Sequence, residues 1–313
     1  MNTTAKLSAF GTALVLVVGG AYGVGTAVGP LDTATTSTDH GSDSGGTGHA
    51  STVPDSTSEL PGGLASSLGG YTFTPTASTL PAKDTTDFTF RITGPGGEAV
   101  TAFDVEHDRA MHLIVVRRDG SGFQHLHPAM APDGTWSAPL QVPTGGSYRA
   151  FADFTPTGAA ATVLGVDLTA PGLFEPATHQ PTRTASVDGY QVTLTGDLIG
   201  GQASPLTLTV RRDGRPVTDL EPYLGAYGHL VALREGDLAY LHIHPDSPTT
   251  SAGPDIPFVA DVPTQGSYRL FLDFQHDGVV RTAAFTAPTG PALPDAATTP
   301  PSARHTDDGG HGH

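Results

Sequence analysis

The chain contains a long internal repeat. Tyr71 to about Ala170 matches Tyr190 to about Ala287, and VPTGGSYRAFADF in the first copy corresponds to VPTQGSYRLFLDF in the second. A period near 120 residues is the length of a domain rather than of a solenoid unit. Each copy also divides into short alternating apolar runs, with turn residues at roughly 8–12-residue spacing. The sequence therefore predicts an all-β fold with two tandem immunoglobulin-like β-sandwich domains.

The sandwiches account for only part of the chain. We expect a transmembrane anchor or signal segment at 1–30, a disordered Ser/Thr/Gly linker at 31–65, the first sandwich at 66–172, a linker at 173–183, the second sandwich at 184–288 and a disordered histidine-rich tail at 289–313. The tails contain five histidines that could capture metal weakly, or could have no function. These are His40, His49, His305, His311 and His313.

The N-terminal segment is hydrophobic. Leu7 to Val28 is uncharged and mostly apolar, and Lys6 precedes it. A stretch of about 20 such residues can span a bilayer as a helix, although a short basic start also fits a secretory signal. We favour a retained single-pass anchor in the cell membrane, with secretion after signal cleavage as the alternative. In both cases the bulk of the chain is expected to be extracytoplasmic.

The composition restricts the chemistry. A formal net charge of −16 argues against nucleic acid or an anionic membrane surface as a partner and would favour cations. The chain has no cysteine, so disulfides and thiolate sites are excluded, and its three methionines argue against a methionine-rich Cu(I) site. A metal site would have to use imidazole and carboxylate ligands, which suit Cu(II) or Zn(II).

Each copy contains a hairpin with histidines at its open end. The hairpins are MHLIVVRRDGSGFQHLHP and GHLVALREGDLAYLHIHP, with turns expected at Asp119-Gly120 and Gly236-Asp237. Counting outward from the turns places one histidine opposite another in each copy. The expected pairs are His112 with His127, Ile114 with His125, His229 with His244, and Val231 with His242. Opposed Cβ atoms lie roughly 4.5–5.5 Å apart, so each hairpin predicts three histidines converging on one face.

A fourth ligand is needed at each predicted site. Asp153 and Asp273 occupy equivalent places in the two YRxFxDF strands, either as ligands or as outer-shell acceptors beside their own histidines. His107 and His276 have no histidine counterpart in the other copy, so two sites of unequal affinity are expected. The candidate metal ligands are His107, His112, His125, His127, Asp153, His229, His242, His244, Asp273 and His276.

Other interpretations are simpler. The histidines could be a hydrogen-bonded packing cluster in a structural or adhesive envelope protein with pH-responsive histidines. Tyr148 and Tyr268 fit the corner tyrosine of such sandwiches, and Trp136 fits the core. We expect no enzyme, no catalytic residues and no organic cofactor, because the chain lacks the common hydrolase, phosphate-binding and dinucleotide-binding motifs. If the imidazoles are ligands, affinity should fall near the ordinary histidine pKa of about 6.5.

The paired H-x-H-P motifs, the YRxFxDF strands and the tethered layout carry a resemblance over roughly residues 66–290. The chain resembles actinobacterial cell-envelope proteins, and in plan it is similar to YtkA-like and CopC-like extracytoplasmic sandwiches linked to copper handling. This resemblance implies copper, whereas the spacing alone indicates only a histidine cluster. The expected partners are therefore a metal ion and, through the N-terminal helix, the membrane; no protein partner is indicated.

Overall fold

The structure is a computed structural model that describes residues 61–82, 85–241, 243–245 and 251–290. Every element in these ranges is a β-strand. No helix long and apolar enough to cross a membrane occurs among them. The expected N-terminal anchor, the linker up to residue 60 and the tail from residue 291 lie outside the described residues.

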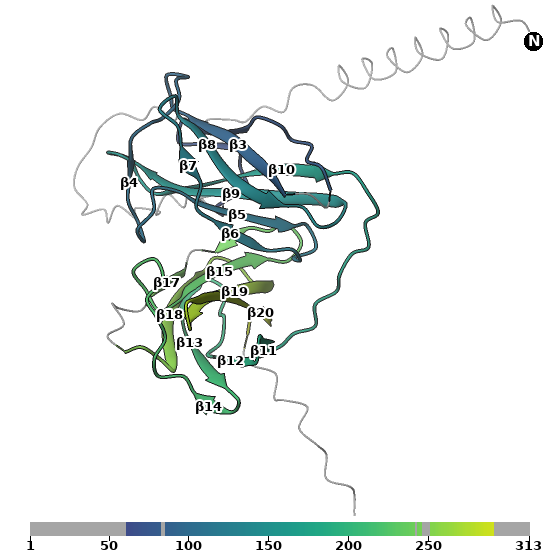
Figure 1. Ribbon diagram of the computed structural model, residues 1–313, viewed down its shortest axis with the longest axis vertical. Coiled ribbons are helices and arrows are strands. Elements are labelled where there is room, and N and C mark those ends of the chain that lie inside the picture. The colour runs from purple at the N-terminus through teal and green to yellow at the C-terminus, as the bar shows by residue number, and fades with distance from the viewer. Residues whose placement is uncertain (1–60, 83–84, 242, 246–250, 291–313) are drawn as a thin grey trace, which may run out of the picture. The chain divides into compact units, whose positions relative to one another are not determined.

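The first sandwich consists of two sheets (Figure 1). One sheet has the order β1-β2-β3-β8-β7, and its strands are β1 (Ser67–Leu68), β2 (Tyr71–Pro75), β3 (Thr85–Thr93), β8 (Thr135–Gln141) and β7 (Ala129–Met130). The other has the order β10-β9-β5-β6, with β4 also pairing with β9; its strands are β10 (Thr162–Ala170), β9 (Gly146–Pro156), β5 (His112–Arg117), β6 (Gln124–Leu126) and β4 (Phe103–Asp104).

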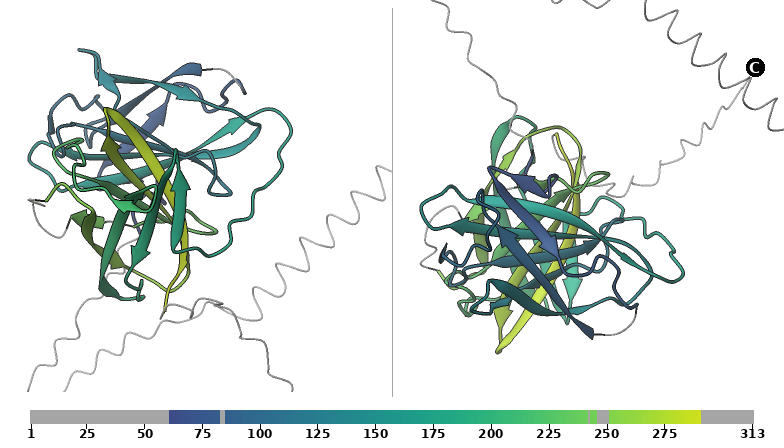
Figure 2. Two further views of the ribbon diagram at one scale, coloured as in Figure 1. Left: turned by 60° about the horizontal axis from the view of Figure 1, so that its bottom comes forward. Right: turned by 90° about the horizontal axis from the view of Figure 1, so that it is seen from above.

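The second sandwich repeats this arrangement. One sheet has the order β11-β12-β13-β18-β17, with β14 also pairing with β13; its strands are β11 (Thr184–Val187), β12 (Tyr190–Thr195), β13 (Gln202–Arg212), β18 (Asp255–Val262), β17 (Ile243–Pro245) and β14 (Arg215–Pro216). The other has the order β16-β15-β19-β20, and its strands are β16 (Tyr240–Leu241), β15 (His229–Arg234), β19 (Ser267–His276) and β20 (Val279–Pro288), the long yellow strand of Figure 2.

These strand orders are those of an immunoglobulin-like fold. Alternating burial of side chains explains why these segments form strands. In β3 the side chains of Phe88, Phe90 and Ile92 are buried, while their neighbours are exposed or half-buried. Trp136 lies in the first core, as predicted. The prediction of two tandem immunoglobulin-like sandwiches is therefore confirmed.

Both corner tyrosines form the expected hydrogen bond. The Tyr148 hydroxyl donates to the carbonyl oxygen of Thr144 at 2.8 Å. The Tyr268 hydroxyl donates to the carbonyl oxygen of Thr264 at 3.0 Å. Both rings are 1% exposed, so each phenol closes its corner while its ring fills the core. These two tyrosines are structural.

A third hydrophobic cluster joins the two sandwiches, which belong to one compact unit of the chain. We call it the interdomain cluster. It is separate from the two sandwich cores, and Phe123 and Phe271 stack within it with ring centroids 4.0 Å apart. Its buried members are Ile114, Val116, Phe151, Val231, Leu233, Leu238 and Phe271. Burial of this much apolar surface stabilises the contact between the sandwiches.

The segment leading into the first strand also lies at this contact. Gly62 forms an isolated β-bridge with Tyr240 of the second sandwich. The buried Arg149 guanidinium donates to the carbonyl oxygens of Gly63, at 2.6 and 3.0 Å, and of Leu64, at 2.9 Å. These residues, which the sequence places at the end of a disordered linker, are thus held by both sandwiches.

Candidate metal centre at the contact between the sandwiches

The backbone of the first hairpin has the expected register. Ile114 pairs with His125 and Leu113 with Leu126 across β5 and β6. Continuing this register brings His127 opposite His112, one residue beyond the end of β6. Opposed residues share a face, so the three histidines lie on one side of the sheet together with Ile114.

That side of the sheet is the contact between the sandwiches. Leu113 and Val115 on β5 belong to the core of the first sandwich, whereas Ile114 and Val116 belong to the interdomain cluster. Both faces of β5 are therefore buried, which is why the sequence shows apolar residues on both. The side chains of His112, His125 and His127 point away from their own core and toward the second sandwich.

The three rings converge. We call His112, His125 and His127 the histidine cluster. One ring nitrogen from each lies within 4.8 Å of those of the other two. The ring centroids are 5.3 Å apart for His112 and His125, 5.1 Å for His112 and His127, and 4.8 Å for His125 and His127. The three nitrogens are thus close enough for a small inward movement to bring them around one ion.

Hydrogen bonds at the outer nitrogens of His112 and His125 define which nitrogen of each ring carries a proton. His112 Nε2 donates to the carbonyl oxygen of Glu106 at 3.1 Å, and His125 Nδ1 donates to the Asp273 carboxylate at 2.8 Å. Between them, His112 Nδ1 lies 3.1 Å from His125 Nε2. These three contacts require three protons, whereas two neutral imidazoles beside a carboxylate carry only two. The inner contact therefore needs one further cation shared by the two nitrogens, either a proton or a metal ion.

The spacing of these inner nitrogens suits a transition metal. Two nitrogen ligands about 2.0–2.1 Å from a tetrahedral Zn(II) are about 3.3–3.4 Å apart. The observed separation of 3.1 Å is slightly shorter. A movement of a few tenths of an ångström would thus admit a metal ion between His112 and His125.

His127 offers a ring nitrogen that could coordinate a metal ion. Its Nε2 is buried and has no hydrogen-bond partner among the described residues. A buried polar atom without a partner costs folding free energy, so such atoms are uncommon unless something binds them. Desolvation, and then the neighbouring His125 and His112, lower the pKa of His127 to about 3. Desolvation likewise lowers the pKa of His112 to about 4, so both rings are neutral at physiological pH and can act as ligands.

The two aspartates contact opposite sandwiches. Asp273 pairs along the backbone with His229 of its own sandwich, yet its carboxylate accepts from His125 of the first. Asp153 pairs along the backbone with His112, and its carboxylate accepts from the Tyr240 hydroxyl of the second sandwich at 3.1 Å. Desolvation raises the pKa of Asp153 to about 6 and that of Tyr240 well above its ordinary value. Each aspartate thus reaches across the contact rather than only toward its own hairpin.

The second hairpin differs from the expectation. Leu233 pairs with Tyr240 as expected, but His244 pairs with Val259 of β18 in the other sheet of the second sandwich. His244 therefore does not continue the hairpin opposite His229, because the chain crosses between sheets just after Leu241. His242 lies outside the described residues. The expected opposition of His229 and His244 is not formed.

Other candidate histidines lie beside the cluster. His229 Nε2 donates to the carbonyl oxygen of Tyr223 at 2.8 Å, and desolvation lowers the pKa of His229 to about 4. Its ring centroid is 5.2 Å from that of His107 and 6.4 Å from that of His125. A cavity of about 110 Å³ connects these groups, and its polar lining includes His107, His112, His125, Asp153, His229 and Tyr240. Tyr240 was not among the sequence candidates, although it shares a face with them by register.

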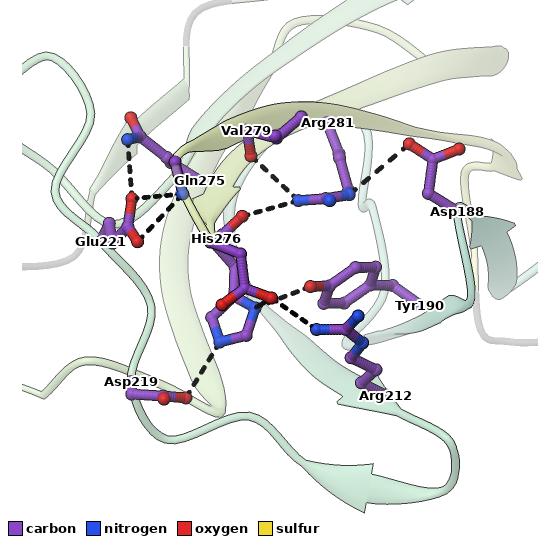
Figure 3. A network of polar contacts seen from close by, with 11 residues as sticks. Asp188, Tyr190, Arg212, Asp219, Glu221, Gln275, His276, Val279 and Arg281 are labelled. Atoms are coloured by element: carbon purple, nitrogen blue, oxygen red, sulfur yellow. Dashed lines mark hydrogen bonds and ion pairs between the residues drawn. The ribbon is translucent and has the colours of Figure 1, made fainter.

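His276 belongs to a separate network (Figure 3). Its Nδ1 lies 2.6 Å from the Tyr190 hydroxyl and its Nε2 lies 3.1 Å from an Asp219 carboxylate oxygen. Arg281 donates to the carbonyl oxygen of His276, and Arg212 pairs with Asp277 nearby. Both ring nitrogens thus have protein partners at the far end of β19, so the structure does not bring His276 to the histidine cluster.

The fold and the site together define a protein of two immunoglobulin-like sandwiches with a polar, histidine-lined cavity where they meet. A family model described as a domain of unknown function, DUF8832, matches residues 66–169 and again residues 185–290. The chain belongs to this family and contains two copies of its domain. No curated protein matches the chain.

Several solved structures are distantly similar. The Escherichia coli adhesin FdeC is 13% identical with a TM-score of 0.24, and the match covers 71% of this chain and 65% of the FdeC chain. Invasin, a bacterial integrin-binding protein, is 13% identical with a TM-score of 0.23, covering 70% of this chain and 40% of that one. A chimeric titin Z1Z2 tandem is 12% identical with a TM-score of 0.20, covering 71% and 100%. The chain thus spans less than two thirds of FdeC and of invasin, and no function is transferred from these proteins.

Proposed function

We propose that this protein binds one divalent transition metal ion, Cu(II) or Zn(II), through His112, His125 and His127, as part of extracytoplasmic metal homeostasis or resistance. The observation that carries the proposal is the close approach of His112 Nδ1 and His125 Nε2, 3.1 Å apart, on two rings whose outer nitrogens both have acceptors. The unpartnered Nε2 of His127 supports it. An all-nitrogen donor set suits Cu(II) and Zn(II).

The proposal assigns one tight site to each chain rather than two. The second hairpin does not place His244 opposite His229, so it lacks the paired geometry of the first. A first-sandwich site with three imidazoles leaves a position for a fourth ligand, which could be water or another side chain.

A titration tests this proposal. The full chain, stripped of metal with a chelator, is titrated with Cu(II) and with Zn(II) by calorimetry near neutral pH. We expect one tight site per chain. Replacement of the tail histidines His40, His49, His305, His311 and His313 by alanine is the control, and it should leave the tight site intact. Absence of binding stronger than that of a short H-x-H peptide would remove the proposal.

His127→Ala is the sharpest single variant. The Nε2 of His127 makes no hydrogen bond among the described residues, so the substitution should cost the fold little. We expect affinity to fall by more than about 100-fold, since loss of a ligand should exceed the 10–100-fold cost of losing an outer-shell partner. An unchanged affinity would show that His127 is not a ligand.

The second candidate function is structural. In this alternative the histidines are packing groups in an envelope or adhesive protein. The buried contact between His125 and Asp273 favours it, because both side chains are only 6% exposed and a shared proton could complete the hydrogen-bonded chain without metal. The same titration separates the two functions: a structural cluster would show no tight binding, while its histidine variants would still alter stability.

A further inference from the structure

We infer that the metal centre belongs to both sandwiches, with Asp273 of the second sandwich acting as the positioning residue for His125 of the first. This inference rests on the proposed metal binding and adds to it the origin and role of the outer-shell carboxylate. It also predicts that metal binding and the contact between the sandwiches stabilise each other. The geometry of Asp273 carries the argument.

Asp273 is held in place from its own sandwich. Its Oδ1 accepts a hydrogen bond from the Thr282 hydroxyl of the neighbouring strand β20 at 2.5 Å. Backbone pairing places it directly opposite His229 and Thr282. The residue is 4% exposed, so its carboxylate has little freedom to turn toward solvent. The remaining oxygen, Oδ2, is the one that accepts from His125.

This contact determines which nitrogen of His125 can bind metal. Because Nδ1–H is directed at the Asp273 carboxylate, Nε2 carries the lone pair and faces His112. Carboxylates that accept from the outer nitrogen of a metal-bound histidine fix the ring orientation and raise the basicity of the ligand. In this protein that acceptor is supplied by the other sandwich, 148 positions along the chain.

The equivalent aspartate of the first sandwich has a different partner among the residues that the structure describes. Asp153 accepts from a phenol, that of Tyr240, whereas Asp273 accepts from an imidazole. The register of the two hairpins makes Phe123 the counterpart of Tyr240, so the two ends of the contact are chemically different. A suitable control is Asp219, whose carboxylate also accepts from a histidine ring nitrogen, that of His276, in a network separate from the histidine cluster.

Linkage follows from this arrangement. A metal bound to His125 strengthens the hydrogen bond to Asp273, and Asp273 reaches His125 only while the sandwiches are in contact. Metal should therefore favour the contacting arrangement, and by reciprocity loss of the contact should weaken metal binding. The stacked Phe123 and Phe271 rings mark the apolar part of the same contact.

The test compares Zn(II) affinity of the full-length chain and of Asp273→Asn, with Asp219→Asn as the control. We expect Asp273→Asn to weaken affinity by about 10–100-fold, the range for loss of an outer-shell partner. Asp219→Asn should change it by less than about threefold. Thr282→Val is a milder variant at an exposed position that leaves the Asp273 charge in place; it should weaken affinity by about 3–10-fold.

Two further measurements separate positioning from general damage. Ring ¹⁵N NMR of the metal-free protein should show His125 as the Nδ1–H tautomer, and Asp273→Asn should lose that preference. Hydrogen exchange at β6 and β15 should slow on addition of Zn(II) in the unmodified chain and much less in Asp273→Asn.

The outcomes are distinguishable. If the unmodified chain binds no metal, the proposed function fails. If it binds metal but Asp273→Asn and Thr282→Val bind equally well, only the shared centre fails. If Asp219→Asn weakens binding as much as Asp273→Asn, net charge rather than position is responsible, and the inference is overturned.

Discussion

Asp273 accepts a hydrogen bond from His125 of the other sandwich at 2.8 Å, although the strand pairing of Asp273 is with His229. The residue that pairs with Asp273 along the backbone is therefore not the residue that its side chain contacts. The candidate site thus depends on how the two copies of the domain meet, as well as on each hairpin.

The pH dependence of metal affinity should be shallow. Free histidine ligands would lose affinity below pH about 6.5, with up to three protons competing at a three-histidine site. The pKa of His112 is lowered to about 4 and that of His127 to about 3, so protons do not compete with metal at these two imidazoles between pH 6.5 and 5. We expect affinity to fall by no more than about tenfold per pH unit in this range. A fall of 100-fold per unit, measured by Zn(II) competition titration, would contradict this.

Stability of the metal-free protein should rise with pH. His112, His127 and His229 have folded-state pKa values of about 4, 3 and 4, below the unfolded value of 6.5, so between pH 4 and 6.5 the unfolded chain binds more protons at these positions. Asp153, with a folded pKa of about 6, binds a proton in the native state and offsets one of the three. Stability should therefore be lost as pH falls from 6.5 toward 4.

We expect the unfolding free energy to change by about 1–2 kcal/mol per pH unit near pH 5. This slope is lower than the uptake of three full protons on unfolding would give, because His112 and His127 are only half-buried. Urea unfolding in the presence of a chelator at several pH values measures it. His127→Asn should reduce the slope by up to the contribution of one proton. A flat profile would mean that the cluster is protonated equally in both states.

Asp153→Asn should stabilise the metal-free protein above pH 6. The raised pKa of Asp153 means that its charged form is unfavourable in the folded state. An asparagine oxygen can still accept from the Tyr240 hydroxyl. We expect a gain of about 1–2 kcal/mol at pH 8, less than the full shift in pKa implies because the residue is half-buried, and almost none at pH 4, where the carboxyl is protonated. An equal gain at both pH values would exclude charge as the cause.

The corner tyrosines should contribute equally. Tyr148→Phe and Tyr268→Phe each remove a hydroxyl that donates to a backbone carbonyl oxygen. Each should lower the unfolding free energy by about 1 kcal/mol, and the two losses should add because the corners are in different sandwiches. Neither should alter metal affinity. Urea unfolding of both single variants and the double variant checks this, and a strongly non-additive result would contradict independent corners.

Much of the fold could be predicted from local pattern. Strand alternation and the repeat predict two sandwiches. Counting from the expected Asp119-Gly120 turn gives the observed Ile114–His125 register, although the hydrogen-bonded turn itself runs from Arg117 to Gly120. Register is local, since it depends only on a turn and on which face is apolar. The sequence could not show which face of β5 is the core, because Leu113 and Ile114 are both completely buried, one in each kind of apolar cluster.

The contact between the sandwiches could not be predicted in this way. Nothing in the spacing of YRAFADF and YRLFLDF indicates that Asp273 reaches His125 or that Asp153 reaches Tyr240. Such pairs depend on how the two domains pack against each other. Hydrophobic periodicity within one strand carries no information about that packing. The crossing of the chain after Leu241 to pair with β18 was also missed, because the same short run can extend either of two sheets.

The path of the leading segment should be sensitive to one added methyl group. A Cβ at Gly165 would lie 1.9 Å from the carbonyl oxygen of Gly63, which no real contact allows. Gly165→Ala should therefore displace Gly62–Leu64 and expose this segment to limited proteolysis. Gly62→Ala is the control, because its Cβ would meet its nearest neighbour at an ordinary 3.5 Å. Equal protease resistance of both variants would contradict the packing described.

The position of Gly62 has a mechanical consequence. Its backbone pairs with Tyr240, and the Tyr240 hydroxyl donates to Asp153. Arg149 donates hydrogen bonds to the carbonyl oxygens of the next two residues, Gly63 and Leu64. Tension transmitted along the chain into Gly62 would thus act first on the strand residues that face the junction of the two sandwiches, Tyr240 of β16 and Arg149 of β9. A pull at this point would act on the wall of the histidine-lined cavity through Tyr240, one of its lining residues.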